Sequence, residues 1–268
     1  MAEAAGAGQN RHMTSVPVRS VVRALDLLEA LNRQAVSTLD MLHAQTRIPK
    51  STLVRLLQTF EGRGFIRHAP QHGAYLLAEG VRSLSSGYHG EPMVVEAAAP
   101  LMDAMTLRVK WPLALALLEG HAMVVRYSTI PLSPLAMRHS TINFRLSLVS
   151  RAIGRAYLAF CAPEQQQPLL QALRQSTEPE DQPARDEGAV RGLLARIREA
   201  GYALRDTQVV PATNTLAVPV FDAHGVAASL GLTFFASTMR PEQAVERFLP
   251  ELQALARAIG ERLQALQQ

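Results

Sequence analysis

The apolar pattern in the first third of the chain predicts three helices followed by a hairpin. The first helix covers residues 20–32, where apolar residues recur every three or four positions. Ser37 is predicted to cap the second helix, because Asp40 follows at the spacing of a capping box. After a third helix, two short strands, 65–67 and 74–76, enclose a turn rich in Pro and Gly. This order is typical of a winged helix-turn-helix.

The third predicted helix separates an apolar face from faces suited to DNA. Its apolar residues fall at i, i+3, i+4 and i+7: Leu53, Leu56, Leu57 and Phe60. The other faces carry small, hydroxylated or cationic side chains without a carboxylate, so they can enter a major groove without repelling phosphate. We expect base contacts from three of them: Ser51, Thr52 and Arg55. Four further cations are candidates for phosphate contacts: Arg47, Lys50, Arg63 and Arg67.

The distribution of charge agrees with nucleic-acid binding. Residues 1–88 hold 10 Lys/Arg and 6 Asp/Glu, which leaves 27 − 10 = 17 cations and 23 − 6 = 17 anions for the rest. The net charge of +4 therefore lies entirely in the N-terminal part. A scatter of surface charge is the alternative explanation, but between residues 47 and 67 five cations are accompanied only by Glu61.

From Trp111 onward the pattern predicts a second domain that mixes strands and helices. Strands are expected over 113–118, 121–127, 144–147, 216–221 and 227–235. Helices are expected over 94–107, 151–160, 164–174, 188–199 and 241–267. Pro250 should kink the last helix or divide it in two. The fold class is therefore α+β, a winged helix-turn-helix followed by an antiparallel sheet with flanking helices.

The composition excludes several classes of protein. Hydrophobic residues make up 48% of the chain, enough for packed cores, yet no apolar run reaches the ~18 residues of a membrane span. A single cysteine, Cys161, excludes an internal disulfide and fits a cytoplasmic location. No His-x-x-x-His or Cys-x-x-Cys pair, phosphate-binding loop or Gly-x-Ser-x-Gly elbow occurs. We therefore expect no metal, no cofactor and no enzymatic activity.

Four segments resemble the IclR family of bacterial transcription regulators, from about Val18 to the C-terminus. They are 20–29, 48–57, 154–159 (Gly-Arg-Ala-Tyr-Leu-Ala), and 201–203 together with 216–222. Within the family, residues 110–112, 122–126 and 158–161 look most like the activators of 3-hydroxyphenylpropionate catabolism. The predicted division is a disordered tail over 1–17, a winged helix-turn-helix over 18–78, a linker over 79–92, and an effector-binding domain over 93–268.

The resemblance implies a winged-helix dimer, usually assembled as a dimer of dimers, and a GAF-like effector-binding domain. It places the effector between the sheet and the loop around Gly154. Carried over by position, the pocket residues are Ala152, Ile153, Gly154, Thr215, Gly231 and Thr233. Arg155 replaces the usual lysine, and Gly231 stands where the family often has serine or asparagine. From side-chain size we expect a larger, less polar pocket that suits an aromatic acid.

Arginines are the expected contacts for such an acid, because a guanidinium binds a carboxylate through two parallel hydrogen bonds. Four lie in the stretch expected to surround the pocket: Arg126, Arg138, Arg145 and Arg151. We favour Arg138 and Arg151, with a surface role as the alternative for each. His139 is a candidate for orienting a ring hydroxyl, and Trp111 for an aromatic wall. A structural role and a core position are their respective alternatives.

The resulting hypothesis is a ligand-responsive regulator of a catabolic operon. Its expected partners are near-palindromic operator DNA, RNA polymerase and a small aromatic carboxylic acid, such as a hydroxyphenylpropionate or hydroxybenzoate. One alternative is a repressor that senses a small aliphatic acid. Another, from a different class, is a small-molecule-binding protein or enzyme whose N-terminal module binds protein.

Overall fold

The computed structural model describes residues 16–87 and 92–267. They form two compact units that meet along the chain at Ser86 and Gly87, and each is described by itself. Most of the tail predicted over 1–17 lies outside the described residues, as does the 88–91 part of the predicted linker.

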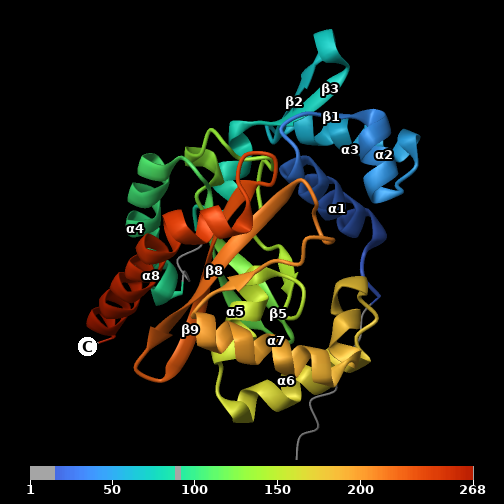
Figure 1. The fold of residues 1–268 in the computed structure, drawn as a ribbon. Coiled ribbons are helices and arrows are strands. Elements are labelled where there is room, and N and C mark those ends of the chain that lie inside the picture. Colours follow the sequence, from blue (N-terminus) through green and yellow to red (C-terminus); the bar gives the residue numbers. More distant parts are fainter. Residues whose placement is uncertain (1–15, 88–91, 268) are drawn as a thin grey trace, which may run out of the picture. The chain divides into compact units, whose positions relative to one another are not determined.

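The N-terminal unit is a winged helix-turn-helix (Figure 1). Its helices are α1 (Arg19–Arg33), α2 (Leu39–Thr46) and α3 (Lys50–Gly62). Its strands are β1 (Ser37–Thr38), β2 (Ile66–Ala69) and β3 (Ala74–Leu77), which form an antiparallel sheet in the order β1-β3-β2. Two 3-10 turns, Pro70–His72 and Glu79–Leu84, follow β2 and β3 respectively. Leu53 and Leu57 of α3 are buried in the core of this unit, as the apolar spacing predicted.

The start of α2 differs from the prediction. Thr38, not Ser37, caps this helix, because its Oγ1 accepts a hydrogen bond of 3.3 Å from the backbone N–H of Met41. Ser37 is fully buried and pairs with Tyr75 in the small sheet. The prediction of Ser37 as the cap is therefore wrong, because the strand takes up this residue before the helix begins.

The C-terminal unit is an antiparallel sheet of six strands between two layers of helices (Figure 1). The strands, in spatial order, are β6 (Arg145–Ser147), β5 (Ala122–Ser128), β4 (Leu113–Glu119), β9 (Gly225–Phe235), β8 (Thr213–Asp222) and β7 (Ala203–Leu204). One layer contains α4 (Met93–Val109) and α8 (Pro241–Leu266). The other contains α5 (Ala152–Phe160), α6 (Pro163–Gln175) and α7 (Glu187–Ala200). The predicted α+β class is confirmed.

Four local details of this unit depart from the expected pattern. Helix α8 runs through Pro250 as a single element, so of the two expected effects of this proline, a kink or a division, the division does not occur. The two-residue strand β7 was not predicted and pairs with β8. The charged loop between α6 and α7 contains a 3-10 turn, η4 (Pro179–Arg185). Another turn, η3 (Ile130–Leu132), begins the irregular segment between β5 and β6.

Gly154 allows α5 to pack directly on the backbone that precedes it. A Cβ atom at this position would lie 2.1 Å from the carbonyl oxygen of Ser147 and 2.6 Å from the Cα of Leu148. Both are backbone atoms, which cannot turn aside as the end of a side chain can. The glycine therefore fixes how closely the start of α5 approaches the end of β6.

Substitution Gly154→Ala is expected to lower the free energy of unfolding by about 1–3 kcal/mol, because the added methyl group overpacks this contact. Urea denaturation followed by circular dichroism measures the change. Gly192→Ala in α7 is the matched control, since its Cβ would meet only the end of the Arg196 side chain, at 3.5 Å. The control should gain roughly 0.5–1 kcal/mol from the better helix former. Equal midpoints for the two variants would contradict the packing role of Gly154.

Candidate functional site

The seven residues predicted to contact DNA all belong to the N-terminal unit. Three lie on α3, where Ser51 and Arg55 are exposed and Thr52 is half-buried. Arg47 ends α2 in a left-handed conformation with φ 56°, and Lys50 is the first residue of α3. Two further arginines complete the set, one directly after α3 and one on β2: Arg63 and Arg67.

The few carboxylates near these cations are already engaged. Lys50 Nζ lies 2.5 Å from Asp40 Oδ1, and this ammonium lowers the pKa of the Asp40 carboxyl. Glu61 Oε1 accepts a hydrogen bond of 3.1 Å from the backbone N–H of His68 on β2. The His68 ring stacks on Tyr75, with centroids 4.7 Å apart. Of the seven candidates, only Lys50 forms an ion pair within the described residues, so the other cations are available to phosphate.

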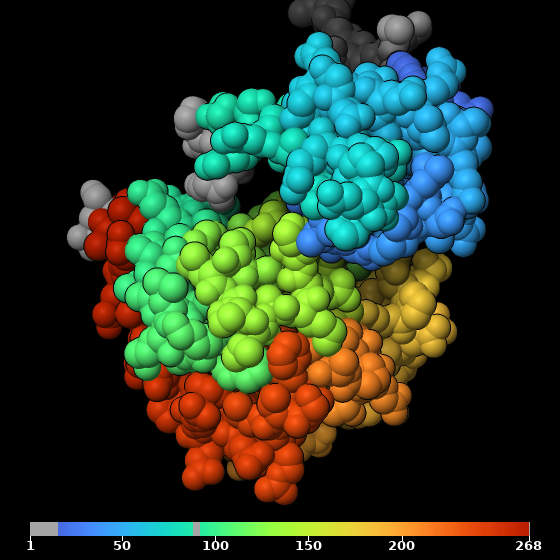
Figure 2. Space-filling view, turned by 90° about the horizontal axis from the view of Figure 1, so that it is seen from above, coloured from blue at the N-terminus to red at the C-terminus, as the bar shows by residue number. Residues whose placement is uncertain are grey.

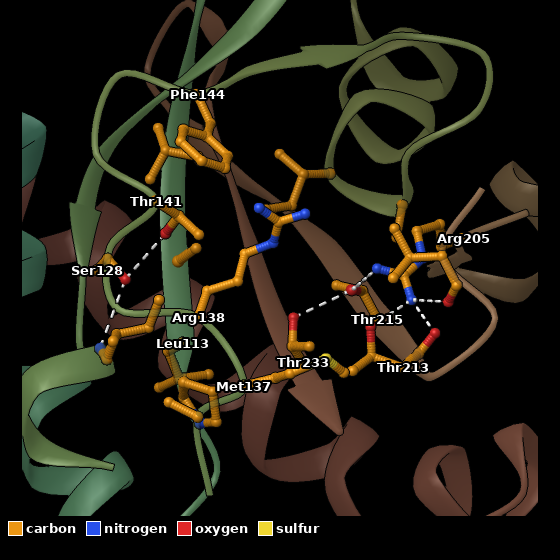
Figure 3. Close-up of a pocket in the computed structure, with 18 of the residues that line it drawn as sticks. Leu113, Ser128, Met137, Arg138, Thr141, Phe144, Arg205, Thr213, Thr215 and Thr233 are labelled. Atoms are coloured by element: carbon orange, nitrogen blue, oxygen red, sulfur yellow. Dashed lines mark hydrogen bonds between the residues drawn. The ribbon is translucent and has the colours of Figure 1, made fainter. Parts of the chain in front are cut away.

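The C-terminal unit contains a cavity of about 300 Å³ beside its sheet (Figure 3). Its floor comes from β4, β5, β8 and β9, and the start of α5 closes one side. The segment between β5 and β6, which lies on the surface and is yellow-green in Figure 2, forms another part of the wall. Apolar side chains that line the cavity include Leu113, Val125, Ile130, Leu135, Met137, Phe144, Ile153, Val210 and Phe235.

Six of the ten residues predicted to bind the effector line this cavity. They are Arg138, Arg151, Ala152, Ile153, Thr215 and Thr233. The other four, Trp111, His139, Gly154 and Gly231, are not among the lining residues. Of these four, His139 is exposed on the segment between β5 and β6, and Gly154 has the packing role described above.

Gly231 does not enlarge the cavity, so that expectation is wrong. A Cβ at Gly231 would lie only 2.7 Å from the side chain of Ile153 and 3.1 Å from that of Thr215. The space left by the missing side chain is therefore already filled. Trp111 is a core residue whose ring packs edge-to-face on Phe235, with centroids 5.4 Å apart, so it supports a lining side chain from behind.

Arg151 is neutralised within the protein. Its Nε and Nη2 donate hydrogen bonds of 2.7 and 2.5 Å to the two carboxylate oxygens of Glu180 on η4. The backbone carbonyl of Glu180 accepts hydrogen bonds from Ser147 Oγ at 3.0 Å and Ser150 Oγ at 2.6 Å. This bidentate pair holds η4 against the loop before α5.

Arg205 is the cavity residue that the sequence analysis missed. It is 7% exposed, and its Nη2 donates hydrogen bonds to uncharged oxygens only: the carbonyls of Val210 and Thr213 and the Thr213 hydroxyl, the last at 2.8 Å. Its Nε has no hydrogen-bond partner in the described part of the chain. Burial, with a further contribution from Arg151, lowers the pKa of Arg205 to about 10.

Arg155, which stands in place of the family's usual lysine, holds the Arg205 segment in position. Its Nε donates a hydrogen bond of 2.6 Å to the Val149 carbonyl, and its Nη1 one of 3.0 Å to the Leu204 carbonyl. Its Nη2 lies 3.3 Å from the carboxylate of Asp206. The larger guanidinium thus joins the loop before α5 to the two residues that flank Arg205.

Arg138 reaches the cavity from the opposite side (Figure 3). Its guanidinium lies over the ring of Phe144, 5.3 Å from the centroid, and it forms no ion pair among the described residues. Ser128 and Thr141 lie near this end, with hydroxyls 3.2 Å apart. Figure 3 shows a second group of hydroxyls next to Arg205, where those of Thr215 and Thr233 are 3.0 Å apart.

The balance of charge identifies the chemistry that the cavity suits. Four arginines line it, Arg138, Arg145, Arg151 and Arg205, and no Asp or Glu of the described chain does. Apolar walls with cations and hydroxyls at the edges suit a small organic acid. In residues 16–87 and 92–267, His, Cys, Asp and Glu form no metal-binding group of three or more, and no helix is long and apolar enough to cross a membrane.

Comparison with known proteins agrees with both parts of the structure. Residues 20–70 match the IclR helix-turn-helix domain, and residues 88–261 match the family described as bacterial transcriptional regulator IclR C-terminal. This chain belongs to the IclR family. Because the family and the relatives below are transcriptional regulators, this IclR protein is a DNA-binding regulator and not an enzyme, as its sequence predicted.

The relatives are similar over most of their length. The DNA-binding transcriptional repressor YiaJ of Escherichia coli K12 is 30% identical over 91% of this chain and 88% of its own. The regulator XynR of the same strain is 29% identical over 91% of this chain and 98% of its own. Among solved structures, an IclR homologue from Microbacterium hydrocarbonoxydans complexed with 4-hydroxybenzoate shares the fold, with a TM-score of 0.57 and 21% identity over 92% of this chain and 99% of its own.

Proposed function

We propose that this IclR regulator controls a catabolic operon in the cytoplasm and responds to a small aromatic carboxylic acid, such as a hydroxyphenylpropionate or hydroxybenzoate. The observation that carries the proposal is the cavity lined by four arginines and no carboxylate of the described chain. The 4-hydroxybenzoate complex of a protein with the same fold supports an aromatic acid. The resemblance to activators of 3-hydroxyphenylpropionate catabolism favours activation, with RNA polymerase as a further partner.

The protein is proposed to bind its operator as a homodimer or a dimer of dimers. The start of helix α1 supports this, because exposed apolar side chains recur there at helical spacing, from the N-cap residue onward: Val18, Val21, Val22 and Leu25. These four side chains are 42–64% exposed. At this spacing they lie on one face and form an apolar stripe along the start of the helix. A second copy of the same helix, packed against this stripe, would bury it in a symmetric contact. Such a dimer presents two α3 helices to successive major grooves.

A fluorescence-anisotropy titration tests the proposed function as a whole. Labelled DNA from upstream of the gene is titrated with the protein at several salt concentrations, with and without a panel of hydroxylated aromatic acids. We expect tight binding that weakens steeply with salt, because phosphate contacts release counterions, and a shift of affinity with one class of acid. If saturating acids leave affinity, footprint and transcription unchanged, the aromatic-acid effector is excluded.

The role of Arg55 is tested separately. Arg55→Ala is expected to cost about 1–3 kcal/mol of binding to the operator if the side chain is bidentate to guanine, with little loss on unrelated DNA. Competition titrations with operator and random duplexes measure the ratio. Arg33→Ala is the control, because Arg33 ends α1 and pairs with Glu29 at 3.5 Å. An equal loss on every duplex would instead make Arg55 a phosphate contact.

A further inference from the structure

The four arginines of the cavity differ in whether a carboxylate of the protein pairs with them. Arg151 is paired bidentately with Glu180, as described above. Arg145 Nη1 lies 3.4 Å from Glu119 Oε1, and its Nη2 donates a hydrogen bond of 3.1 Å to the Glu119 carbonyl. Among the described residues, two of the four cations, Arg151 and Arg145, therefore already form ion pairs with carboxylates.

The other two cations meet no carboxylate of the described chain. Arg205 is bonded only to uncharged oxygens and keeps an unpartnered Nε, although it is 93% buried. Among the described residues, Arg138 contacts the face of the Phe144 ring and forms no ion pair. For the buried Arg205 an unpaired charge is costly, and an anion that binds beside it removes this cost. Arg138 is exposed and offers a second cation to the same cavity.

The two unpaired arginines lie on opposite sides of the same space. Figure 3 shows Arg138 reaching in from the segment between β5 and β6, and Arg205 lying at the other side, beside Thr213 and Thr215. Much of the remaining lining is apolar, Leu113, Val125 and Ile153 among it, and offers nothing to a charged group. Because the two guanidiniums enter from different sides, a ligand with one anionic group at each end would pair with both.

We propose that the effector carries two acidic groups, one bound by Arg205 and the other by Arg138, joined by an apolar spacer the size of a benzene ring. This inference rests on the proposed function, because it assumes that the cavity is the effector site. It narrows the ligand from any small aromatic acid to a dicarboxylate, or an acid with an equivalent second anion. A neutral ring hydroxyl makes only the weaker contacts of an uncharged group at the Arg138 end.

Matched ligands test the proposal by calorimetry at constant ionic strength. Benzoate, 4-hydroxybenzoate and benzene-1,4-dicarboxylate differ only in the group opposite the carboxylate, and the 1,3-substituted series covers a shorter span. We expect at least one dicarboxylate to bind ~10-fold or more tightly than its hydroxylated counterpart, since a second charge-assisted contact is gained. The same dicarboxylate should then shift operator affinity further than the monoacid does.

Variants locate the second anion. Arg138→Gln should bring the ratio of dicarboxylate to benzoate affinity close to unity, because it removes the cation that pairs with the second acidic group. Arg126→Gln is the matched control, since Arg126 is also on this side of the unit but does not line the cavity and is bonded to Glu119 and to Asn143. It should keep the full preference.

The outcomes separate the two proposals. If monoacids bind and neither dicarboxylate binds more tightly, the dianion is excluded and the acid-responsive regulator stands. A preference that survives in Arg138→Gln also overturns the assignment. If no acid binds at all while operator binding is normal, both proposals are excluded: the aromatic-acid effector and the effector with two acidic groups.

Discussion

Replacing Leu25 by glutamate is expected to lower affinity for the full operator by roughly 10²–10⁴-fold, the advantage that linking two binding modules typically confers. Leu25 is 56% exposed on α1 and belongs to the apolar stripe with Val21 and Val22. A carboxylate at this position would be buried without a partner in the proposed dimer. The two α3 helices would then bind independently.

Half-site DNA makes this result specific. The wild type should bind a duplex with both half-sites far more tightly than one with a single half-site, whereas the Leu25→Glu variant should bind the two alike. Leu84→Glu is the control, because Leu84 is 62% exposed in the same unit but lies outside α1. A Leu25→Glu protein that keeps the wild-type ratio would show that the dimer forms elsewhere.

The second large effect is expected at Arg205. Arg205→Gln should weaken binding of the tightest acid of the benzoate series by about 30-fold or more, because loss of one partner of a buried charge pair costs about 2–5 kcal/mol. Operator affinity without acid should stay unchanged, since Arg205 belongs to the C-terminal unit and not to the winged helix. Calorimetry and anisotropy measure the two affinities.

A conservative variant separates binding from folding. Arg205→Lys keeps the charge but loses the planar fork that reaches several oxygens at once, so its affinity should lie between those of the wild type and Arg205→Gln. Thermal melts show whether either variant has lost its fold. If a folded Arg205→Gln protein binds the acid as tightly as the wild type, the assignment of the effector carboxylate to Arg205 is wrong.

The N-terminal unit was predictable from sequence because its signals are local. The spacing of Leu53, Leu57 and Phe60 defines one helix face without knowledge of any distant residue, and these three side chains are buried. The cap of α2 was misplaced by one residue, since Ser37 and Thr38 are both suitable caps and only the pairing of Ser37 with β3 distinguishes them. A short strand such as β1 carries too few residues for a period to appear.

The cavity residues were harder to predict, because the cavity is formed by contacts between residues that are far apart in the sequence. The arginines considered from sequence all precede α5 or begin it, whereas Arg205 follows β7 and lies beside Thr213 and Thr215 only because β8 returns along the sheet. An arginine directly after an apolar pair was a weak signal for it. Gly231 was misjudged for the same reason, because its register on β9 does not reveal that Ile153 fills the space above it.

The two sides of the cavity wall differ in how well they tolerate amino-acid substitutions. The Arg205 side is built on strands and held from behind by Arg155, so a change there disturbs the core of the unit. The Arg138 side belongs to an irregular, exposed segment, where substitutions are tolerated far better. During divergence of such regulators, the lining around Met137 and Arg138 can therefore change by exchange of a few residues, while the part of the cavity around Arg205 is inherited unchanged.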